Sequence, residues 1–433
     1  MNHVEKIVEL LGKSYSAFHA VKNIKEELLE AGFIQLDEKE NYHLELGKNY
    51  FVTRNDTSIL AFKLPKKLTD YHMQLTATHN DSPTFKIKPN PVKKVFNLLQ
   101  LNTEPYGGLI MNTWFDKPLS FAGRVLVKNG NRIESHLLNV NQDLLIIPNV
   151  CIHMNRDINS GYKYNAAVDT LPIMGEWDDN FDFNQYLLQQ LGLSQGKVLS
   201  FDLFLYNREQ PRLIGRNKEL LSCGRLDDLS AAYSTLFGFM ESESKEHISV
   251  YASFDNEEVG SLTKQGANST FLQDNLKRII LCLGGNKDDF QKAMAASMML
   301  SIDNAHANHP NHPELSDKTT DVELNKGIVI KYNANQSYTS DALSSSVVKS
   351  LCVENNIPYQ EFTNRSDLRG GSTLGNLSEA EVSITTVDIG LPQLAMHSSY
   401  ETQGAKDVDY NVELVKAFFS AEIQFKDSDV EIR

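Results

Sequence analysis

The feature that most constrains the fold is a series of short apolar segments of strand length, separated by segments with helical periodicity. The strand patterns are "YHMQLTATH", ending at His79, "HISVYASF", with a strand over Ile248–Phe254, "MMLSID", ending at Asp303, and "EVSITTVDIG", ending near Ile389. A helical pattern is "AFHAVKNIKEELLEAGF", whose apolar residues recur every three or four positions before Gly32. This alternation predicts an α/β fold with a central mixed sheet, at least partly parallel, and flanking helices.

A central segment of the chain has a different pattern. Between residues 91 and 224, "SFAGRVLVKNG", "NRIESHLL" and "KVLSFDLFLYN" read as β-rich segments joined by turns such as Asn129-Gly130. A length of 433 residues is enough for two or three domains. We therefore predict a smaller β-rich domain over 91–224, inserted into a discontinuous domain formed by 1–90 and 225–433.

Charge and composition exclude several classes of function. A formal net charge of −14 argues against nucleic-acid partners, which require a basic face. The first fifteen residues carry Glu5 and Glu9 and have no apolar signal core, and no apolar stretch approaches the ~20 residues of a membrane span. The four cysteines are scattered, and those in "LCL" and "SLCV" are expected to be reduced core thiols. We expect a cytoplasmic protein with no membrane partner.

Side chains that bind metals follow several of the predicted strands. They are His79, Glu257, Glu258, Asp303 and, after "DIGLPQLAM", His397, with Asp227 just before a helix. Open α/β sheets place ligands beyond the carboxyl ends of their strands. Mixed nitrogen and oxygen ligation suits zinc, and the number of ligands suits two ions that share a carboxylate.

Other histidines are interpreted as structural. His306, His309 and His312 recur every third residue, but a proline follows each of the last two, so one helix cannot present all three on one face. We expect loop histidines there, with Asp303 as the coordinating residue. His19 lies near the apolar face of its helix and is expected to be a packed core histidine.

Seven ordered segments resemble the motifs of the aspartyl aminopeptidase family, which are dinuclear-metal exopeptidases. The segments are "THNDSPTFKIKP", "GRLDDL", "SFDNEEVGS", "SIDNAHANHPNHP", "KYNANQSY", "GGSTLG" and "LPQLAMHSSYE". The resemblance covers nearly the whole chain. It implies a zinc-exopeptidase-like catalytic domain interrupted by a β-rich dimerisation domain. The expected activity is metal-dependent removal of N-terminal residues from peptides, and the expected assembly is a homo-oligomer, a tetrahedral dodecamer built from dimers.

The resemblance also assigns metal ligands. Asp227 matches the carboxylate that bridges two metal ions. His79 and Asp303 match the ligands that complete one site, and Glu258 and His397 match those of the other. The expected cofactor is two Zn²⁺ per subunit, with Mn²⁺ or Co²⁺ also compatible with these ligands.

Two further acids receive catalytic roles from the resemblance. Glu257 matches the general base, which takes a proton from the attacking water and passes it to the leaving amine. Asp81 matches the acid that orients the imidazole of His79.

Substrate-binding residues are implied in the same way. His153, in "CIHMNR", matches a histidine of the dimerisation domain that reaches the partner subunit's active site. Lys331, Tyr338 and Met396 match positions that line the substrate pocket. Family members selective for N-terminal Asp or Glu commonly carry Asp-Thr-Gln-Pro ahead of the bridging aspartate, where this chain has "YNREQP" with Asn207. The preferred N-terminal residue, acidic or neutral, therefore stays open.

Three alternative functions would use parts of the same sequence differently. A deacylase or dipeptidase could use the same dinuclear core. A non-catalytic, shell-forming assembly protein is disfavoured by the intact set of ligands. A nucleotide-binding role for "RGGSTLG" is disfavoured because this segment lacks the P-loop lysine and the GxGxxG spacing.

Overall fold

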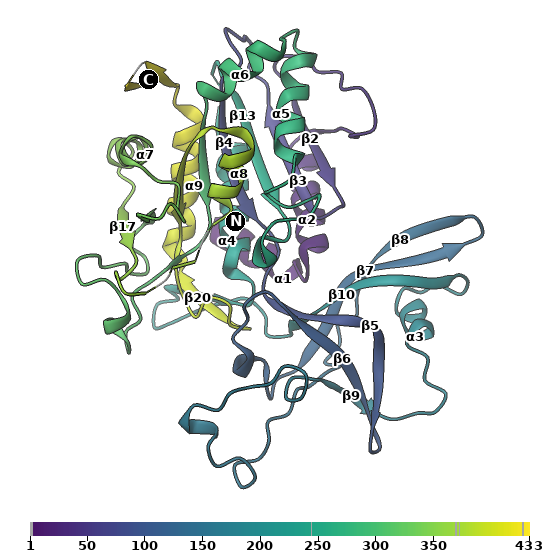
Figure 1. Cartoon of the computed structure of the whole chain (residues 1–433). Helices are drawn as coiled ribbons and strands as arrows, with labels where there is room; N and C mark the ends of the chain where they lie inside the picture. Colours follow the sequence, from purple (N-terminus) through teal and green to yellow (C-terminus); the bar gives the residue numbers. More distant parts are fainter. Residues whose placement is uncertain (1–2, 244, 369, 372, 427) are drawn as a thin grey trace.

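A computed structural model describes residues 3–243, 245–368, 370–371, 373–426 and 428–433 (Figure 1). Its largest sheet has nine strands in the order β1-β2-β3-β13-β4-β14-β18-β16-β17. The bounds are β1 Ile34–Gln35, β2 Asn49–Arg54, β3 Ser58–Lys63, β4 Met73–His79, β13 Ile248–Phe254, β14 Met298–Ile302, β16 Ile328–Tyr332, β17 Tyr359–Thr363 and β18 Thr385–Gly390.

This sheet is mixed, as predicted. Strands β13, β4, β14 and β18 run parallel to one another, whereas β3 pairs antiparallel with β13 and β16 pairs antiparallel with β18. The predicted strands that end at His79 and Phe254 are confirmed, while β14 ends at Ile302, just before Asp303.

Helices cover both faces of the nine-stranded sheet, so its central strands are buried along their whole length. In β13, Tyr251 packs into one core cluster, whereas Val250 and Ala252 pack into the other. One cluster contains residues of α1, α2, α4, α7 and α9, and the other contains residues of α5, α6 and α8. The bounds are α1 His3–Lys13, α2 Ala17–Glu30, α4 Leu226–Glu241, α5 Phe271–Cys282, α6 Lys287–Ala295, α7 Ala342–Glu354, α8 Leu374–Val382 and α9 Ala405–Ser420.

Helix α2 shows how the pattern becomes structure. Val21, Ile24 and Leu28 are buried on one face, as the periodicity predicts. The helix ends at Glu30, and Gly32 follows with a φ of 82°, a conformation that glycine adopts without steric cost. His19 is buried, and its Nδ1 lies 2.9 Å from Ser16 Oγ, which confirms the packed histidine.

The β-rich part of the chain forms a separate six-stranded sheet in the order β8-β7-β10-β5-β6-β9, whose pairs are antiparallel. It encloses a core of its own with α3 (Phe183–Gln190), and it appears as a distinct lobe at the lower right of Figure 1. The bounds are β5 Thr84–Val95, β6 Leu98–Tyr106, β7 Leu119–Asn129, β8 Arg132–Asn139, β9 Ile173–Glu176 and β10 Lys197–Asn207. The Asn129-Gly130 turn joins β7 to β8.

Two small sheets complete the fold. One has the order β11-β12-β20-β19-β15, and the other is the C-terminal hairpin β21-β22. The bounds are β11 Arg212–Ile214, β12 Leu220–Cys223, β15 Ala305–His306, β19 Pro392–Leu394, β20 Glu401–Gly404, β21 Ile423–Lys426 and β22 Asp429–Ile432. None of the helices formed by the described residues has the length and apolarity of a membrane span.

All four cysteines are free thiols. Cys352 is buried, as expected, but Cys282 is exposed. The interpretation of "LCL" as a core segment was wrong, because Cys282 is the last residue of α5, and its apolar neighbour Leu281 is also exposed.

Candidate metal centre

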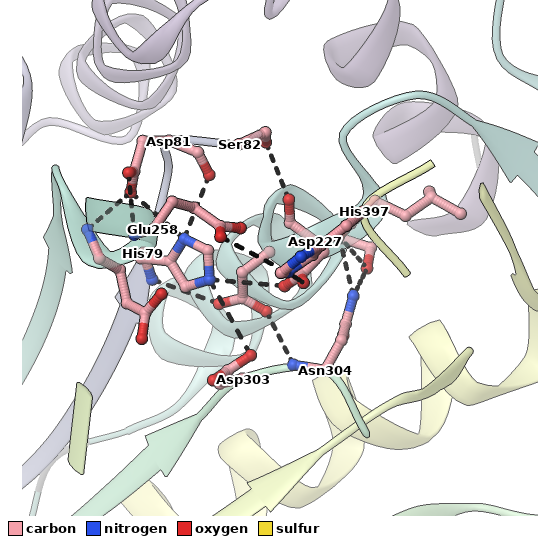
Figure 2. Close-up of polar contacts among 12 residues, drawn as sticks. His79, Asp81, Ser82, Asp227, Glu258, Asp303, Asn304 and His397 are labelled. Carbon is pink, nitrogen blue, oxygen red and sulfur yellow. Dashed lines mark hydrogen bonds and ion pairs between the residues drawn. The ribbon is translucent and has the colours of Figure 1, made fainter. Parts of the chain in front are cut away.

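The six ligand-type side chains identified in the sequence meet beyond the carboxyl ends of the central strands of the nine-stranded sheet. His79 is the last residue of β4, Asp303 follows β14, and Glu257 and Glu258 lie in a single 3-10 turn after β13. The remaining two come from elements beside the sheet. Asp227 lies in the first turn of α4, next to Asp228, and His397 follows β19. Figure 2 shows five of these side chains converging from separate segments: His79, Asp227, Glu258, Asp303 and His397.

These side chains form two groups of possible metal ligands that share Asp227. One contains His79, Asp227 and Asp303, the other contains Asp227, Glu258 and His397, and within each group the ligand atoms lie within 4.8 Å of one another. Asp227 Oδ1 is 3.4 Å from His79 Nε2, and its Oδ2 is 3.4 Å from His397 Nε2. The two oxygens of Asp227 therefore face different groups, which is the arrangement of a bridging carboxylate.

The residues of this cluster fit zinc. The separation of 3.4 Å between His397 Nε2 and Glu258 Oε2 is what two ligands about 2.0–2.1 Å from one tetrahedral ion would show. The buried atoms Asp227 Oδ1 and Glu258 Oε1 have no hydrogen-bond partner among the described residues. Because a buried carboxylate oxygen without a partner is costly, these atoms favour a bound cation.

The electrostatics of the cluster lead to the same conclusion. Burial, reinforced by the charge of Asp227, raises the pKa of Glu258 well above its usual value, and burial also raises the pKa of Asp303. Burial opposes protonation of His397, but its hydrogen bond with Asp227 outweighs this and raises its pKa to about 9. A bound cation would lower the pKa values of these carboxyl groups and of the imidazole, because it favours ionised carboxylates and neutral imidazoles.

Comparison with known proteins identifies the family. Residues 10–419 match the family described as "Aminopeptidase I zinc metalloprotease (M18)". The chain belongs to the M18 aminopeptidase family. It is a zinc-dependent aminopeptidase, and its two ligand groups fit two ions per subunit.

Relatives of this M18 aminopeptidase align along nearly its whole length. A Clostridium novyi (strain NT) protein named "Probable M18 family aminopeptidase 2" is 46% identical over 423 residues, which is 96% of this chain and 98% of the relative. The cryo-EM structure of the Ape4 and Nbr1 complex contains a chain with a TM-score of 0.93 and 35% identity, covering 96% of this chain and 85% of that one. The S. cerevisiae mApe1 dodecamer has a TM-score of 0.83 and 25% identity, and the match covers 96% of each chain.

Glu257 lies beside the two ligand groups that share Asp227, but it belongs to neither of them. Its carboxylate is within 4.8 Å of a ring nitrogen of His79 and a carboxylate oxygen of Glu258. Burial raises the pKa of Glu257 to about 8. A carboxyl group with a raised pKa can hold a proton between two steps of a reaction.

Asp81 ties the histidine ligand to the glutamate pair. Its carboxylate accepts the backbone N–H of Glu257 at 3.1 Å and that of Glu258 at 3.2 Å, and it accepts the hydroxyl of Tyr106 at 2.7 Å. His79 Nδ1 lies 3.4 Å from Asp81 Oδ1 and 3.1 Å from its backbone oxygen. Because Nδ1 faces Asp81, Nε2 is left to face the metal ligands.

Asp228 and Glu401 organise the same centre, and neither was predicted to be functional. Asp228 accepts the backbone N–H groups of His79 and Asn304, each at 3.2 Å. Glu401 accepts the N–H of Asp227 at 3.2 Å and that of His397 at 2.7 Å. Each buried carboxylate therefore joins two ligand segments. Two features of the sequence could have indicated these residues. Asp228 forms an acidic doublet with Asp227 in "GRLDDL", as Glu257 does with Glu258, and Glu401 ends the motif "HSSYE".

The predicted pocket residues lie at the rim of the centre. The buried Lys331 donates a hydrogen bond to the backbone oxygen of Asn304 at 2.9 Å, and its Nζ is 3.8 Å from Asp303 Oδ2. Tyr338 is also buried, and its ring centroid lies 5.5 Å from Lys331 Nζ. Met396 is partly exposed and precedes His397 directly.

Other predicted residues lie apart from the metal centre. His153 is exposed, in the segment between β8 and β9, and none of the hydrogen bonds or ion pairs recorded for the described residues joins it to the ligands. His309 and His312 belong to none of the possible ligand groups found among those residues. His306 was wrongly expected in a loop. It lies in the short strand β15, because Ala305 and His306 pair with β19.

None of the hydrogen bonds that Asn207 forms among the described residues joins it to a candidate metal ligand. Asn207 is buried, accepts the backbone N–H of Glu209 at 3.0 Å and donates to the backbone oxygen of Ser399 at 3.1 Å. It lines a cavity of about 290 Å³ that also contacts Asp81 and strands β5, β7 and β10. In the neighbouring motif "RGGSTLG", Arg369 and Ser372 lie outside the described residues.

Proposed function

We propose that this M18 aminopeptidase removes N-terminal acidic residues from peptides at a dinuclear zinc site. In this assignment Asp227 bridges the two ions, His79 and Asp303 complete one site, and Glu258 and His397 complete the other. The observation that carries the proposal is the pair of ligand groups on opposite oxygens of Asp227.

The residues around the ligands have distinct tasks. When bound, zinc polarises a carbonyl and lowers the pKa of water. Glu257 takes the proton of the attacking water and donates it to the leaving amine, for which a pKa raised by burial is suited. Asp81 holds the His79 ring and the backbone of the glutamate pair in place.

The preference for acidic residues rests on Lys331. Its buried ammonium lies beside the metal ligand Asp303 and, among the described residues, donates to the Asn304 carbonyl. An ammonium has three N–H donors, so a substrate carboxylate can accept another. Zinc bound by Asp303 would also withdraw part of the negative charge that faces Lys331. Asn207 leaves this preference intact, because its side chain is engaged with Glu209 and Ser399.

Aminoacyl anilides test the activity and its preference together. Aspartyl and glutamyl anilides are expected to be cleaved faster than leucyl and alanyl anilides, and chelation is expected to abolish cleavage until Zn²⁺ or Mn²⁺ is restored. Undiminished cleavage by thoroughly metal-free enzyme would exclude the dinuclear mechanism. Faster cleavage of the neutral anilides would assign a neutral pocket instead.

A deacylase or dipeptidase on the same core is the second candidate. N-acetyl amino acids test for a deacylase, because the proposed aminopeptidase site requires a free α-amine. Comparison of dipeptides with longer peptides tests for a dipeptidase, because an aminopeptidase does not require a short substrate. Rapid hydrolysis of the acetylated compounds with inert anilides would establish the second candidate.

We also propose a division into domains and an oligomer. We assign residues 1–90 and 225–433 to the catalytic domain and residues 91–224 to the dimerisation domain. The separate core of the six-stranded sheet supports such a division, although that sheet begins at Thr84 in β5 and β12 pairs with β20. Exposed apolar side chains in that segment, including Val150, Ile152 and Met154, suit an interface.

The assembly that we propose is a tetrahedral dodecamer built from dimers, in analogy with the S. cerevisiae mApe1 dodecamer. Its compartment would be the cytoplasm, which free exposed thiols such as Cys151 support. Mass measurement in solution tests the assembly, and a monomer that is fully active would refute it. A stable dodecamer with intact metals and no peptidase activity would favour a shell-forming role.

A further inference from the structure

A second cluster of metal-binding side chains lies at the opposite end of the nine-stranded sheet. His72 directly precedes β4, and His247 directly precedes β13. The two strands are parallel neighbours with Met73 opposite Ile248, so the two imidazoles lie side by side with ring centroids 6.0 Å apart. The catalytic ligands follow the other ends of the same strands.

Glu422 brings the C-terminal part of the chain to these histidines. It lies between α9 and the hairpin strand β21, which is near the C label in Figure 1. Glu422 Oε1 is 2.6 Å from His72 Nε2, and Oε2 is 3.2 Å from His247 Nδ1. The side chains of the three residues are buried, and their ligand atoms lie within 4.8 Å of one another.

The geometry around His72 favours a cation. His72 Nδ1 forms a hydrogen bond with Asp70, which directs Nε2 toward Glu422. Histidines that bind metals characteristically donate their other ring nitrogen to such a carboxylate. His72 Nε2 and Glu422 Oε1 are buried 2.6 Å apart and have no other hydrogen-bond partner among the described residues, so an ion bound here would replace their direct contact.

The charges at this cluster also require a positive group. Glu422 contacts both histidines and supplies the negative charge. Either a proton on His72 or a metal ion between the ligands can balance this charge.

We propose that His72, His247 and Glu422 bind a third zinc ion, separate from the catalytic pair. Two imidazoles and one carboxylate are a common donor set for zinc and leave a fourth position for water. The ion would fasten the C-terminal hairpin β21-β22 to the beginnings of β4 and β13. Its role is structural, because these residues lie at the end of the sheet away from the peptidase site.

Metal counting tests the proposal on the wild-type protein. Enzyme freed of metal is titrated with Zn²⁺ against a chromophoric chelator, and three tight sites per chain are expected. Only two tight sites would overturn the proposal and leave His72 and Glu422 as an ion pair. This measurement requires no variant to fold.

Matched variants locate the third ion. Glu422→Gln is expected to bind two ions per chain while keeping peptidase activity within about twofold of wild type. His312→Ala, which removes an exposed histidine outside the cluster, is expected to keep all three. Loss of the ion in His312→Ala and its retention in Glu422→Gln would place the third ion in the histidine-rich loop and refute the proposal.

Hydrogen exchange supplies a readout independent of activity. Zn²⁺ is expected to slow amide exchange in β21 and β22 of the wild type but not of Glu422→Gln. Equal slowing in both proteins would show that the hairpin responds to the catalytic metals alone, and the proposed structural role would fall.

Discussion

Glu401 holds the backbone of His397: its Oε1 accepts the His397 N–H at 2.7 Å. Its other oxygen accepts the N–H groups of Leu226 at 2.6 Å and Asp227 at 3.2 Å. A single buried carboxylate thus sets the spacing between two metal ligands that lie far apart in the sequence. The precision of the site depends on this main-chain link as well as on the ligands themselves.

Replacing Glu401 by Gln is predicted to weaken metal binding. The amide retains one acceptor oxygen, but its NH₂ group faces backbone N–H donors and cannot accept from them. Loss of such a supporting contact typically lowers metal affinity about 10–100-fold. Zinc titration of the purified variant measures the effect. Glu413→Gln, on the exposed side of α9, is the matched control, and an equal loss in both variants would refute the positioning role.

Substitutions of the neighbouring glutamates Glu257 and Glu258 are predicted to reduce activity for different reasons. Glu257→Gln removes the proposed base but keeps all five ligands, so activity should fall about 10²–10⁴-fold with metal content unchanged. Glu258→Gln removes a ligand oxygen and should lower the occupancy of one site. Metal analysis and anilide hydrolysis on both variants distinguish the roles. Metal loss in Glu257→Gln with full occupancy in Glu258→Gln would reverse the assignment.

His19 is predicted to make stability sensitive to acid. Burial, assisted by nearby Lys22 and Arg225, lowers its pKa to about 3, compared with about 6.5 in an unfolded chain. Between pH 6.5 and pH 3 the unfolded state therefore binds a proton that the folded state does not bind. The free energy of unfolding declines as the pH falls below 6.5, by at most about 1.4 kcal/mol per pH unit.

A matched variant isolates this contribution from the metal ligands, which also titrate. The difference in melting temperature between wild type and His19→Gln is measured at pH 7.5, 6.5 and 5.5 with the same zinc concentration. The wild type should lose more stability than the variant toward pH 5.5. Parallel decline of the two proteins would mean that folding does not lower the pKa of His19.

The convergence of the candidate ligands could be anticipated from sequence because sheet geometry brings strand ends together. His79, Glu258 and Asp303 each follow a buried apolar run, and that pattern is visible without coordinates. Asp228 and Glu401 could not be anticipated in this way, because they act on backbone N–H groups of segments that meet only in the folded chain.

The cluster of His72, His247 and Glu422 could not be predicted from the sequence for a related reason. His72 and His247 precede their strands, whereas α/β sheets usually place ligands after the carboxyl ends of strands. Their shared register depends on the pairing of β4 with β13, which no spacing in the sequence reveals. Glu422 joins them through the path of the chain after α9.

A final prediction concerns His153 and the completion of the site between subunits. His153 is exposed in the β-rich segment and, among the described residues, has no recorded hydrogen bond or ion pair with the metal ligands of its own chain. We expect its imidazole to enter the partner's pocket and donate to the oxyanion that forms on the scissile carbonyl. Losing one such donor costs about 10²–10³-fold in kcat, so His153→Ala should be nearly inactive while keeping its metals.

Complementation distinguishes a shared site from a self-contained one. Inactive His153→Ala subunits are mixed with inactive Glu257→Gln subunits under conditions that permit exchange. If sites are shared, some mixed dimers pair an intact Glu257 with an intact His153, and activity partly returns. If each chain builds its own site, every site in the mixture still lacks one group, and activity stays at the level of the separate variants. Tagged subunits establish that exchange has occurred, so an inactive mixture with proven exchange would refute the shared site.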